Sequence, residues 1–265
     1  MTTKVLRAAA CHASPIFLSA SKTTQKATTF IQKATSNKAN LVIFPETYIS
    51  AFPVWSAIRA PTENHDLFKR MVDQSIYIDG PEIDALRTTA QKCNTMISIG
   101  ISEKARVLQA DNITGKARNY DNVAANRTRA AAHCFEAKCF GIINAAFLDE
   151  QAIDIVAQGA SNEASVRQTL KLSQRAATMF LDPTGMLMSG FTVDADGKKQ
   201  ETEYLQETED ILYADLDVSE CVEGKQYHDV VGGYQRLDIF DLKVDRSRRD
   251  PARFIEGRHD EESEP

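Results

Sequence analysis

Glu46 is the residue of this sequence whose position best suits acid–base chemistry. Four apolar residues precede it at 41–44 before Pro45, a pattern typical of a short buried strand that ends at a turn. Such a strand would place the Glu46 carboxylate at its C-terminal end, where α/β folds usually carry their chemistry. A carboxylate in this position suits the role of general base. A base needs a nucleophile to deprotonate, and cysteine is the side chain best suited to supply one.

The cysteines do not lie in patterns typical of a reactive thiol. They are Cys11, Cys93, Cys134, Cys139 and Cys221. Cys11 falls in a predicted strand and Cys93 at the end of a predicted helix, where both would be small buried hydrophobes. Cys134 and Cys139 fall on one predicted helix, where five residues turn them about 140° apart, so we expect them not to share a site. His133 and Glu136 flank Cys134 but would point away from it on a helix.

Lysines and histidines give no stronger candidates for a catalytic or metal site. Lys104, Lys116 and Lys138 are each predicted to be solvated surface charges rather than anion stabilisers. The histidines are too scattered for a recognisable metal site. They are His12, His65, His133, His228 and His259. The sequence also lacks the glycine-rich and histidine-rich motifs of nucleotide and zinc enzymes, so no cofactor and no metal is expected.

The predicted elements alternate between strands and helices, which is typical of an α/β fold. The predicted strands are 5–11, 41–44, 95–102, 141–148 and 211–216, with a hairpin over 177–191 that turns at 182–185. The first predicted helix begins near Ser19 or Ser21. The other predicted helices cover 65–75, 81–93, 123–140 and about 163–172. The loop 47–61 carries Trp55 and other aromatic residues. It would either wall a pocket beside Glu46 or pack onto the core.

Four blocks of the sequence resemble the nitrilase family, in the order in which that family carries them. Residues 44–47, Phe-Pro-Glu-Thr, resemble its first catalytic motif, and residues 119–141 resemble the helix downstream of its nucleophile. Residues 182–185 resemble the turn of its late hairpin, and residues 229–236 resemble its C-terminal signature. The blocks lie within residues 4–245, and the resemblance extends over nearly all of that range.

The resemblance implies an α/β fold of the family's α-β-β-α sandwich type, in which two stacked sheets carry helices on both outer faces. Family members convert a nitrile to its acid and ammonia, or act on amides, with a Glu, a Lys and a Cys and with no metal or organic cofactor. The thiolate attacks carbon, the Glu moves protons, and the Lys stabilises the developing negative charge. Only Glu46 maps onto this set, as the proton acceptor.

The family pattern is interrupted where the other two catalytic residues should lie. It stops near Val107 and resumes near Asn119, and residues 108–118 match nothing that the family carries there. We therefore expect a sandwich that is incomplete in its middle, with exposed sheet edges and impaired catalysis. Two alternatives remain open: a non-catalytic subunit or regulator that acts through oligomer interfaces, and an active enzyme with an unrecognised nucleophile. A skipped exon or a wrong gene model would give the same junction.

Size and composition set the remaining expectations. The 265 residues suit one domain over 1–242, followed by a charged tail over 243–265 that is expected to be disordered. A net charge of −6 gives no reason to expect nucleic acid as a partner, and no apolar run is long enough to cross a membrane. An odd number of unpatterned cysteines favours reduced thiols in a cytoplasmic protein. The resemblance also implies that the protein forms a homo-oligomer and that its substrate is a small nitrile or amide.

Overall fold

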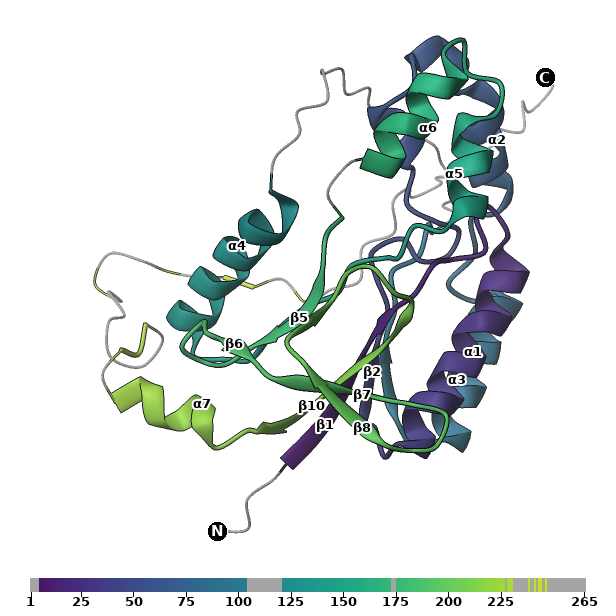
Figure 1. Cartoon of the computed structure of the whole chain (residues 1–265). Coiled ribbons are helices and arrows are strands. Elements are labelled where there is room, and N and C mark those ends of the chain that lie inside the picture. Colours follow the sequence, from purple (N-terminus) through teal and green to yellow (C-terminus); the bar gives the residue numbers. More distant parts are fainter. Residues whose placement is uncertain are drawn as a thin grey trace, which may run out of the picture.

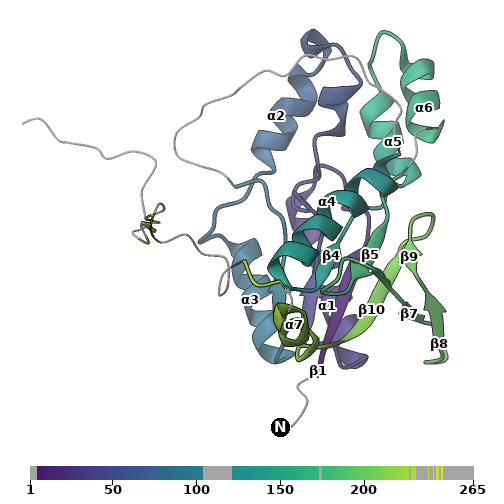
Figure 2. The same cartoon turned by 90° about the vertical axis from the view of Figure 1, so that its left-hand side faces the viewer.

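The protein is built on two β-sheets that lie face to face (Figures 1 and 2). The computed structural model describes residues 5–103, 121–172 and 175–226, with a few positions between 228 and 246. The strands in this part are β1 (Val5–His12), β2 (Leu41–Ile43), β3 (Met96–Ser98), β4 (Gly141–Ile143), β5 (Thr178–Leu181), β6 (Leu187–Met188), β7 (Gly190–Val193), β8 (Lys199–Thr202), β9 (Tyr204–Leu205) and β10 (Asp210–Asp217). One sheet has the order β3-β2-β1-β10-β7-β8, and the other has the order β4-β5-β6 with β9 also paired to β5.

The strand β1 is the centre of the larger sheet. It pairs in parallel with β2 and, along all 8 of its residues, antiparallel with β10. Its side chains alternate between the two faces of the sheet. Ala9 and Cys11 belong to the core under the outer helices, whereas Ala8 and Ala10 belong to the core between the sheets. Both faces of β1 are buried, which explains why its sequence is an almost continuous apolar run.

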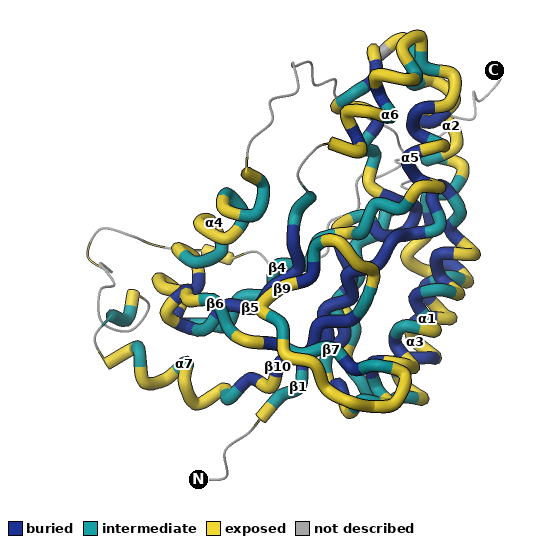
Figure 3. Tube along the Cα trace, in the orientation of Figure 1, coloured by how far each residue is buried: buried dark blue, intermediate teal, exposed yellow. Residues whose placement is uncertain are grey.

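Helices cover the outer face of each sheet. The helices α1 (Ala20–Ser36) and α3 (Pro81–Lys92) lie on the larger sheet, and α4 (Asn122–Ala137) lies on the smaller one (Figures 1 and 2). The layer order is therefore helix, sheet, sheet, helix, as the predicted α-β-β-α sandwich requires. The two sides differ in burial. The helix α1 buries a stripe that includes Ala27, Ile31 and Ala34, whereas α4 buries Cys134 alone (Figure 3).

A third apolar cluster lies at one end of the sheets (top of Figure 1). It contains side chains of α2 (His65–Asp73), α5 (Glu150–Ala157), α6 (Glu163–Leu172) and the 3-10 helix η1 (Val54–Ala57). Trp55 of η1 is 1% exposed and packs edge-on against Phe17, with 5.7 Å between ring centroids. Of the two alternatives for the loop 47–61, packing onto the core therefore holds for Trp55. Phe52, which is 49% exposed, remains free to face a pocket.

Several predicted elements end earlier than the sequence suggested. The predicted strand 95–102 is regular only in β3, because its later residues bond to the loop after Glu46 instead of to a neighbouring strand. The predicted strand 141–148 is likewise shortened to β4. The helix predicted over 123–140 ends at Lys138, which adopts a left-handed conformation with φ 52°. The turn at 182–185 is confirmed, with Gly185 at φ 82°.

Some observed elements were not predicted, and some segments with predictions lie outside the described residues. The helix α5 and the strands β8 and β9 were missed. Three short turns of helix complete the described elements: η2 (Pro61–Glu63), α7 (Glu220–Glu223) and η3 (Gly224–Gln226). The family gap at 108–118 and most of 229–265 lie outside the described residues. Within the described residues, no helix is both long enough and apolar enough to cross a membrane.

Candidate functional site

Glu46 lies in a tight turn just beyond the C-terminal end of β2. Phe44 and Pro45 are buried, and the Phe44 N–H donates to the Ser98 carbonyl oxygen at 2.8 Å, which continues the pairing of β2 with β3. The next residue, Thr47, has a left-handed backbone with φ 50°. This conformation is unusual for a β-branched residue, and such residues cluster at functional sites. The turn leaves the Glu46 side chain exposed.

Gly100 holds this turn against the neighbouring chain. Its N–H donates to the Pro45 carbonyl oxygen at 3.2 Å, and its own carbonyl oxygen accepts from the Ile49 N–H at 3.1 Å. A Cβ atom at Gly100 would lie 2.3 Å from the Thr47 nitrogen and 2.7 Å from the Glu46 Cα. Only glycine permits this close approach of two backbones. The position of Glu46 therefore depends on a residue far from it in the sequence.

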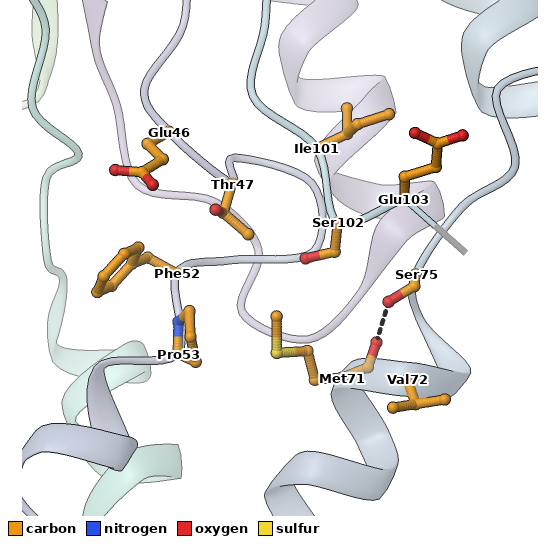
Figure 4. Close-up of a pocket in the computed structure, with 10 residues that line it drawn as sticks. All are labelled: Glu46, Thr47, Phe52, Pro53, Met71, Val72, Ser75, Ile101, Ser102 and Glu103. Atoms are coloured by element: carbon orange, nitrogen blue, oxygen red, sulfur yellow. Dashed lines mark hydrogen bonds between the residues drawn. The ribbon is translucent and has the colours of Figure 1, made fainter. Parts of the chain in front are cut away.

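The Glu46 turn forms one wall of a pocket of about 430 Å³. The lining residues are Glu46, Thr47, Phe52, Pro53, Met71, Val72, Ser75, Ile101, Ser102 and Glu103 (Figure 4). They come from the loop after β2, from the end of α2 and from the segment after β3. The predicted pocket beside Glu46 thus exists in the structure, with Phe52 and Pro53 as its aromatic and apolar wall. The contribution of α2 was missed, because an amphipathic pattern shows which face is buried but not what it faces.

The pocket combines an apolar surface with two acidic side chains. Glu46 and Glu103 lie on opposite sides of it, with their carboxylates directed apart (Figure 4). Among the lining residues there is no cysteine, lysine, arginine or histidine. The Ser102 hydroxyl is buried and has no hydrogen-bond partner in the described structure, whereas the Ser75 hydroxyl donates to the Met71 carbonyl oxygen at 2.8 Å. The pocket can therefore offer a proton acceptor and a free hydroxyl, but no thiol.

The structure brings none of the cysteines to Glu46. Cys11 is buried in the core under the outer helices, and burial raises the pKa of its thiol. Cys93 follows the last turn of α3. The other three lie near the C-terminal end of α4, on the smaller sheet. Here one expectation was wrong: Cys134 and Cys139 interact, because the helix ends between them and the chain turns back, so that the Cys139 N–H donates to the Cys134 carbonyl oxygen at 3.3 Å.

The lysines give a similar picture. Lys104 and Lys116 lie outside the described residues. Lys138 was expected to be a solvated surface charge, but it is 6% exposed, and its Nζ lies 3.8 Å from the centroid of the Phe135 ring. That prediction was wrong because the side chain lies over the end of its own helix and its methylene groups pack near Gly224. Lys138 does not line the pocket.

His12 is the buried histidine of the described structure, and it lies between the sheets, not in the pocket. Its Nδ1 lies 2.8 Å from the Ala145 carbonyl oxygen and 2.9 Å from the Thr178 hydroxyl, and its Nε2 lies 3.2 Å from the Gln206 carbonyl oxygen. Burial lowers its pKa, and the two carbonyl groups oppose this only in part. His228 contacts Glu136 at 2.8 Å, far along the chain from Glu46. Among the described residues, no cluster of three or more His, Cys, Asp or Glu side chains is arranged to hold a metal ion.

Comparison with known proteins agrees with this arrangement. The family model for carbon-nitrogen hydrolases matches residues 7–125, which include the whole Glu46 turn. The chain is 25% identical to a bromoxynil-specific nitrilase of Klebsiella pneumoniae subsp. ozaenae, over 92% of this chain and 86% of that protein. It is also 25% identical to an arylacetonitrilase of Hypocrea virens, over 92% of this chain and 93% of that protein. These matches support membership of the nitrilase, or carbon-nitrogen hydrolase, superfamily.

Solved structures show the same fold at lower sequence identity. The NitFhit protein of C. elegans is similar with a TM-score of 0.53 and 15% identity, over 95% of this chain and 70% of that one. The protein XC1258 of Xanthomonas campestris, a CN-hydrolase superfamily member, is similar with a TM-score of 0.50 and 14% identity, over 84% of this chain and 94% of that one. Both agree with the α-β-β-α sandwich seen in this protein.

The length of the sequence alignments is itself a finding. The alignment with the bromoxynil-specific nitrilase extends over 302 positions, which exceeds the 265 residues of this whole chain. The alignment with the arylacetonitrilase extends over 307 positions. Each alignment must therefore contain positions at which the relative has a residue and this chain has none.

Proposed function

We propose that this protein is a nitrilase-type hydrolase whose substrate site is the pocket beside Glu46 and whose catalysis is impaired. The observation that carries the proposal is the composition of that pocket. Glu46 lines the pocket, where its carboxylate would serve as the general base, and no thiol and no ammonium group is among the lining residues of the described structure. The length of the alignments supports the proposal, because a missing internal segment would lengthen them in this way.

The chemistry that Glu46 can perform follows from what surrounds it. In the mechanism that the family resemblance implies, a carboxylate takes the proton of a thiol, which then attacks the nitrile or amide carbon. If no thiol reaches it, Glu46 has only water to deprotonate, and no cation among the described lining residues stabilises the charge that develops on nitrogen. Loss of a covalent nucleophile lowers turnover by up to about six orders of magnitude in a well-characterised hydrolase. We therefore expect binding without appreciable turnover.

The pocket favours a neutral substrate with an apolar part. Phe52, Met71 and Ile101 supply the apolar surface, and a volume of about 430 Å³ is sufficient for a small molecule. Two carboxylates with no cation among the lining residues disfavour an anionic substrate. A neutral nitrile or amide fits both properties. Substitutions in this pocket should therefore change binding more than they change turnover.

The test is ammonia release by the purified protein from a panel of aliphatic, aromatic and arylaliphatic nitriles and amides. The Glu46→Gln variant keeps the shape of the side chain but removes the base, and Glu103→Gln removes the other carboxylate of the same pocket. We expect no release above that of a protein-free control for any substrate. Both variants should still bind an aromatic nitrile, and this binding can be measured as a shift in the unfolding midpoint.

Two outcomes would contradict parts of this proposal. Ammonia release that Glu46→Gln abolishes and Glu103→Gln retains would show an active enzyme with a nucleophile that lies outside the described lining. Release that is equal in the parent and in Glu46→Gln would remove Glu46 from the mechanism. Sequencing the genomic DNA between the codons for Val107 and Asn119 would show whether the gene itself lacks the missing segment or whether only this gene product lacks it.

The proposal keeps the predicted domain organisation and assembly. One domain over 1–242 is supported by the pairing of β1 with β10, because this pairing joins the beginning and the end of that range in one sheet. Limited proteolysis should then remove only residues of the tail 243–265. A homo-oligomer in the cytoplasm remains part of the proposal, and light scattering at several protein concentrations tests the oligomer directly.

A further inference from the structure

The end of helix α4 carries a pair of thiols that the proposed hydrolase function does not use. The helix ends where Lys138 turns into the left-handed region, and the Cys139 N–H then donates to the Cys134 carbonyl oxygen at 3.3 Å. This geometry reverses the chain and returns Cys139 over the last turn of the helix. Two cysteines that a continuous helix would separate thus lie side by side. Burial, with a further contribution from the neighbouring Cys139 thiol, raises the pKa of Cys134 to about 11.

The surroundings hold the Cys134 sulfur atom in place. The chain passes directly over Cys134 as it enters β4, since a Cβ atom at Gly141 would lie 2.5 Å from the Cys134 Sγ. Cys134 is 2% exposed, whereas Cys139 is half-buried. A reagent from solvent therefore reaches Cys139 first and meets Cys134 only through it. This asymmetry is the one expected of an attacked thiol and a resolving thiol.

A third thiol lies nearby but is held by a different partner. Cys221 belongs to the short helix α7, where burial raises the pKa of its thiol and the Phe140 N–H partly opposes this. Its charge interacts with that of Cys139, but no direct bond between these two thiols is present in the described structure. The pair at the end of α4 is therefore better arranged for bond formation than any pair with Cys221.

We propose that Cys134 and Cys139 form a dithiol site that a peroxide oxidises to an intramolecular disulfide. Hydrogen peroxide transfers one oxygen atom to the Cys139 sulfur, which becomes a sulfenic acid while one water molecule leaves. The Cys134 sulfur then attacks the Cys139 sulfur, the S–O bond breaks, and a second water molecule carries away the hydroxyl group and the Cys134 proton. In total, two thiols are oxidised and one peroxide is reduced to two water molecules.

The test uses the full chain and hydrogen peroxide, followed by alkylation and digestion with trypsin under denaturing conditions. Trypsin cleaves after Lys138, so the two cysteines fall in separate peptides, 130–138 and 139–167, and Cys221 falls in 200–225. We expect a joined species of 130–138 and 139–167 with a mass lower by two hydrogen atoms than that of the reduced peptides. Two of the 5 thiols should be lost to titration, and dithiothreitol should restore both.

Matched variants make the outcome decisive. Cys139→Ser should abolish the joined species, and Cys93→Ser, which removes a half-buried thiol at the end of α3, should leave it unchanged. Unfolding midpoints of both variants within a degree or so of the parent would show that folding is intact. A joined species of 139–167 with 200–225, oxygen addition to Cys139 without cross-linking, or thiol loss that persists in Cys139→Ser would each overturn the proposal.

Discussion

Replacing Gly100 by alanine should disrupt the Glu46 turn more than adding a methyl group at any other position. The new Cβ atom would lie 2.3 Å from the Thr47 nitrogen, 2.6 Å from the Pro45 oxygen and 2.7 Å from the Glu46 Cα. Ordinary contacts of a carbon atom begin near 3.5 Å, so the first of these is about 1 Å too short. All three atoms belong to the backbone, and no side-chain rotation can relieve the overlap.

The magnitude follows from what must move. The two backbones have to separate, and overpacking of this kind costs about 1–3 kcal/mol. Separation also weakens the hydrogen bonds that Gly100 makes with Pro45 and Ile49, each of which contributes about 1 kcal/mol. We expect a loss of about 3–4 kcal/mol in the free energy of unfolding. For a chain of this size, such a loss lowers the unfolding midpoint by roughly 10 °C.

Urea unfolding of Gly100→Ala and of one control variant tests this reasoning. In the control, Gly159→Ala, the new Cβ atom meets nothing within 4 Å, but the residue has φ 77°. That conformation alone costs about 1 kcal/mol for alanine. Gly100 has no such φ, so its loss should come from contact with the Glu46 turn. A loss in Gly100→Ala equal to or smaller than that in Gly159→Ala would refute the argument.

Two further predictions concern other parts of the molecule. Because burial holds the pKa of His12 below its usual 6.5, the unfolded state binds a proton that the folded state does not when the pH falls below 6.5. Stability should then fall by up to about 1.4 kcal/mol per pH unit, and urea titrations between pH 7 and 5 should show a slope that His12→Asn flattens. Trp55→Ala should lower the free energy of unfolding by about 3–5 kcal/mol, because Trp55 is 1% exposed. Phe52→Ala, at 49% exposed, should lower it by less than about 1 kcal/mol, and similar losses for both would contradict the assignment of Trp55 to the core.

The opening of the fold and the place of Glu46 were predictable from the sequence. The apolar runs of β1 and β2, with a helix between them, predict a parallel pair, and Pro45 marks where the second run ends. These are local signals that depend on neighbouring residues. The helix α5 was missed, because the apolar residues before it suggested a longer strand after β4.

The rest of the site depends on contacts that no local pattern encodes. The segment after β3 was predicted as strand from its alternating apolar residues, but its hydrogen bonds go to the loop that follows Glu46. Similarly, the angle between Cys134 and Cys139 was calculated for a continuous helix, and the left-handed Lys138 ends that helix between them. Sequence spacing predicts neighbours only while one regular element lasts.

The pairing of β1 with β10 also sets the order in which this protein can be completed. Arg7 and Asp215, which bond across these strands, are 208 positions apart in the chain. A ribosome that adds about 5–20 residues per second needs roughly 10–40 seconds to synthesise the chain between them. Throughout that interval the edge of β1 that will pair with β10 is open, and the apolar side chains on both faces of β1 are not fully covered. The strand β1 is thus synthesised long before its hydrogen bonds to β10 can form, and chaperones have a long time in which to bind the nascent chain.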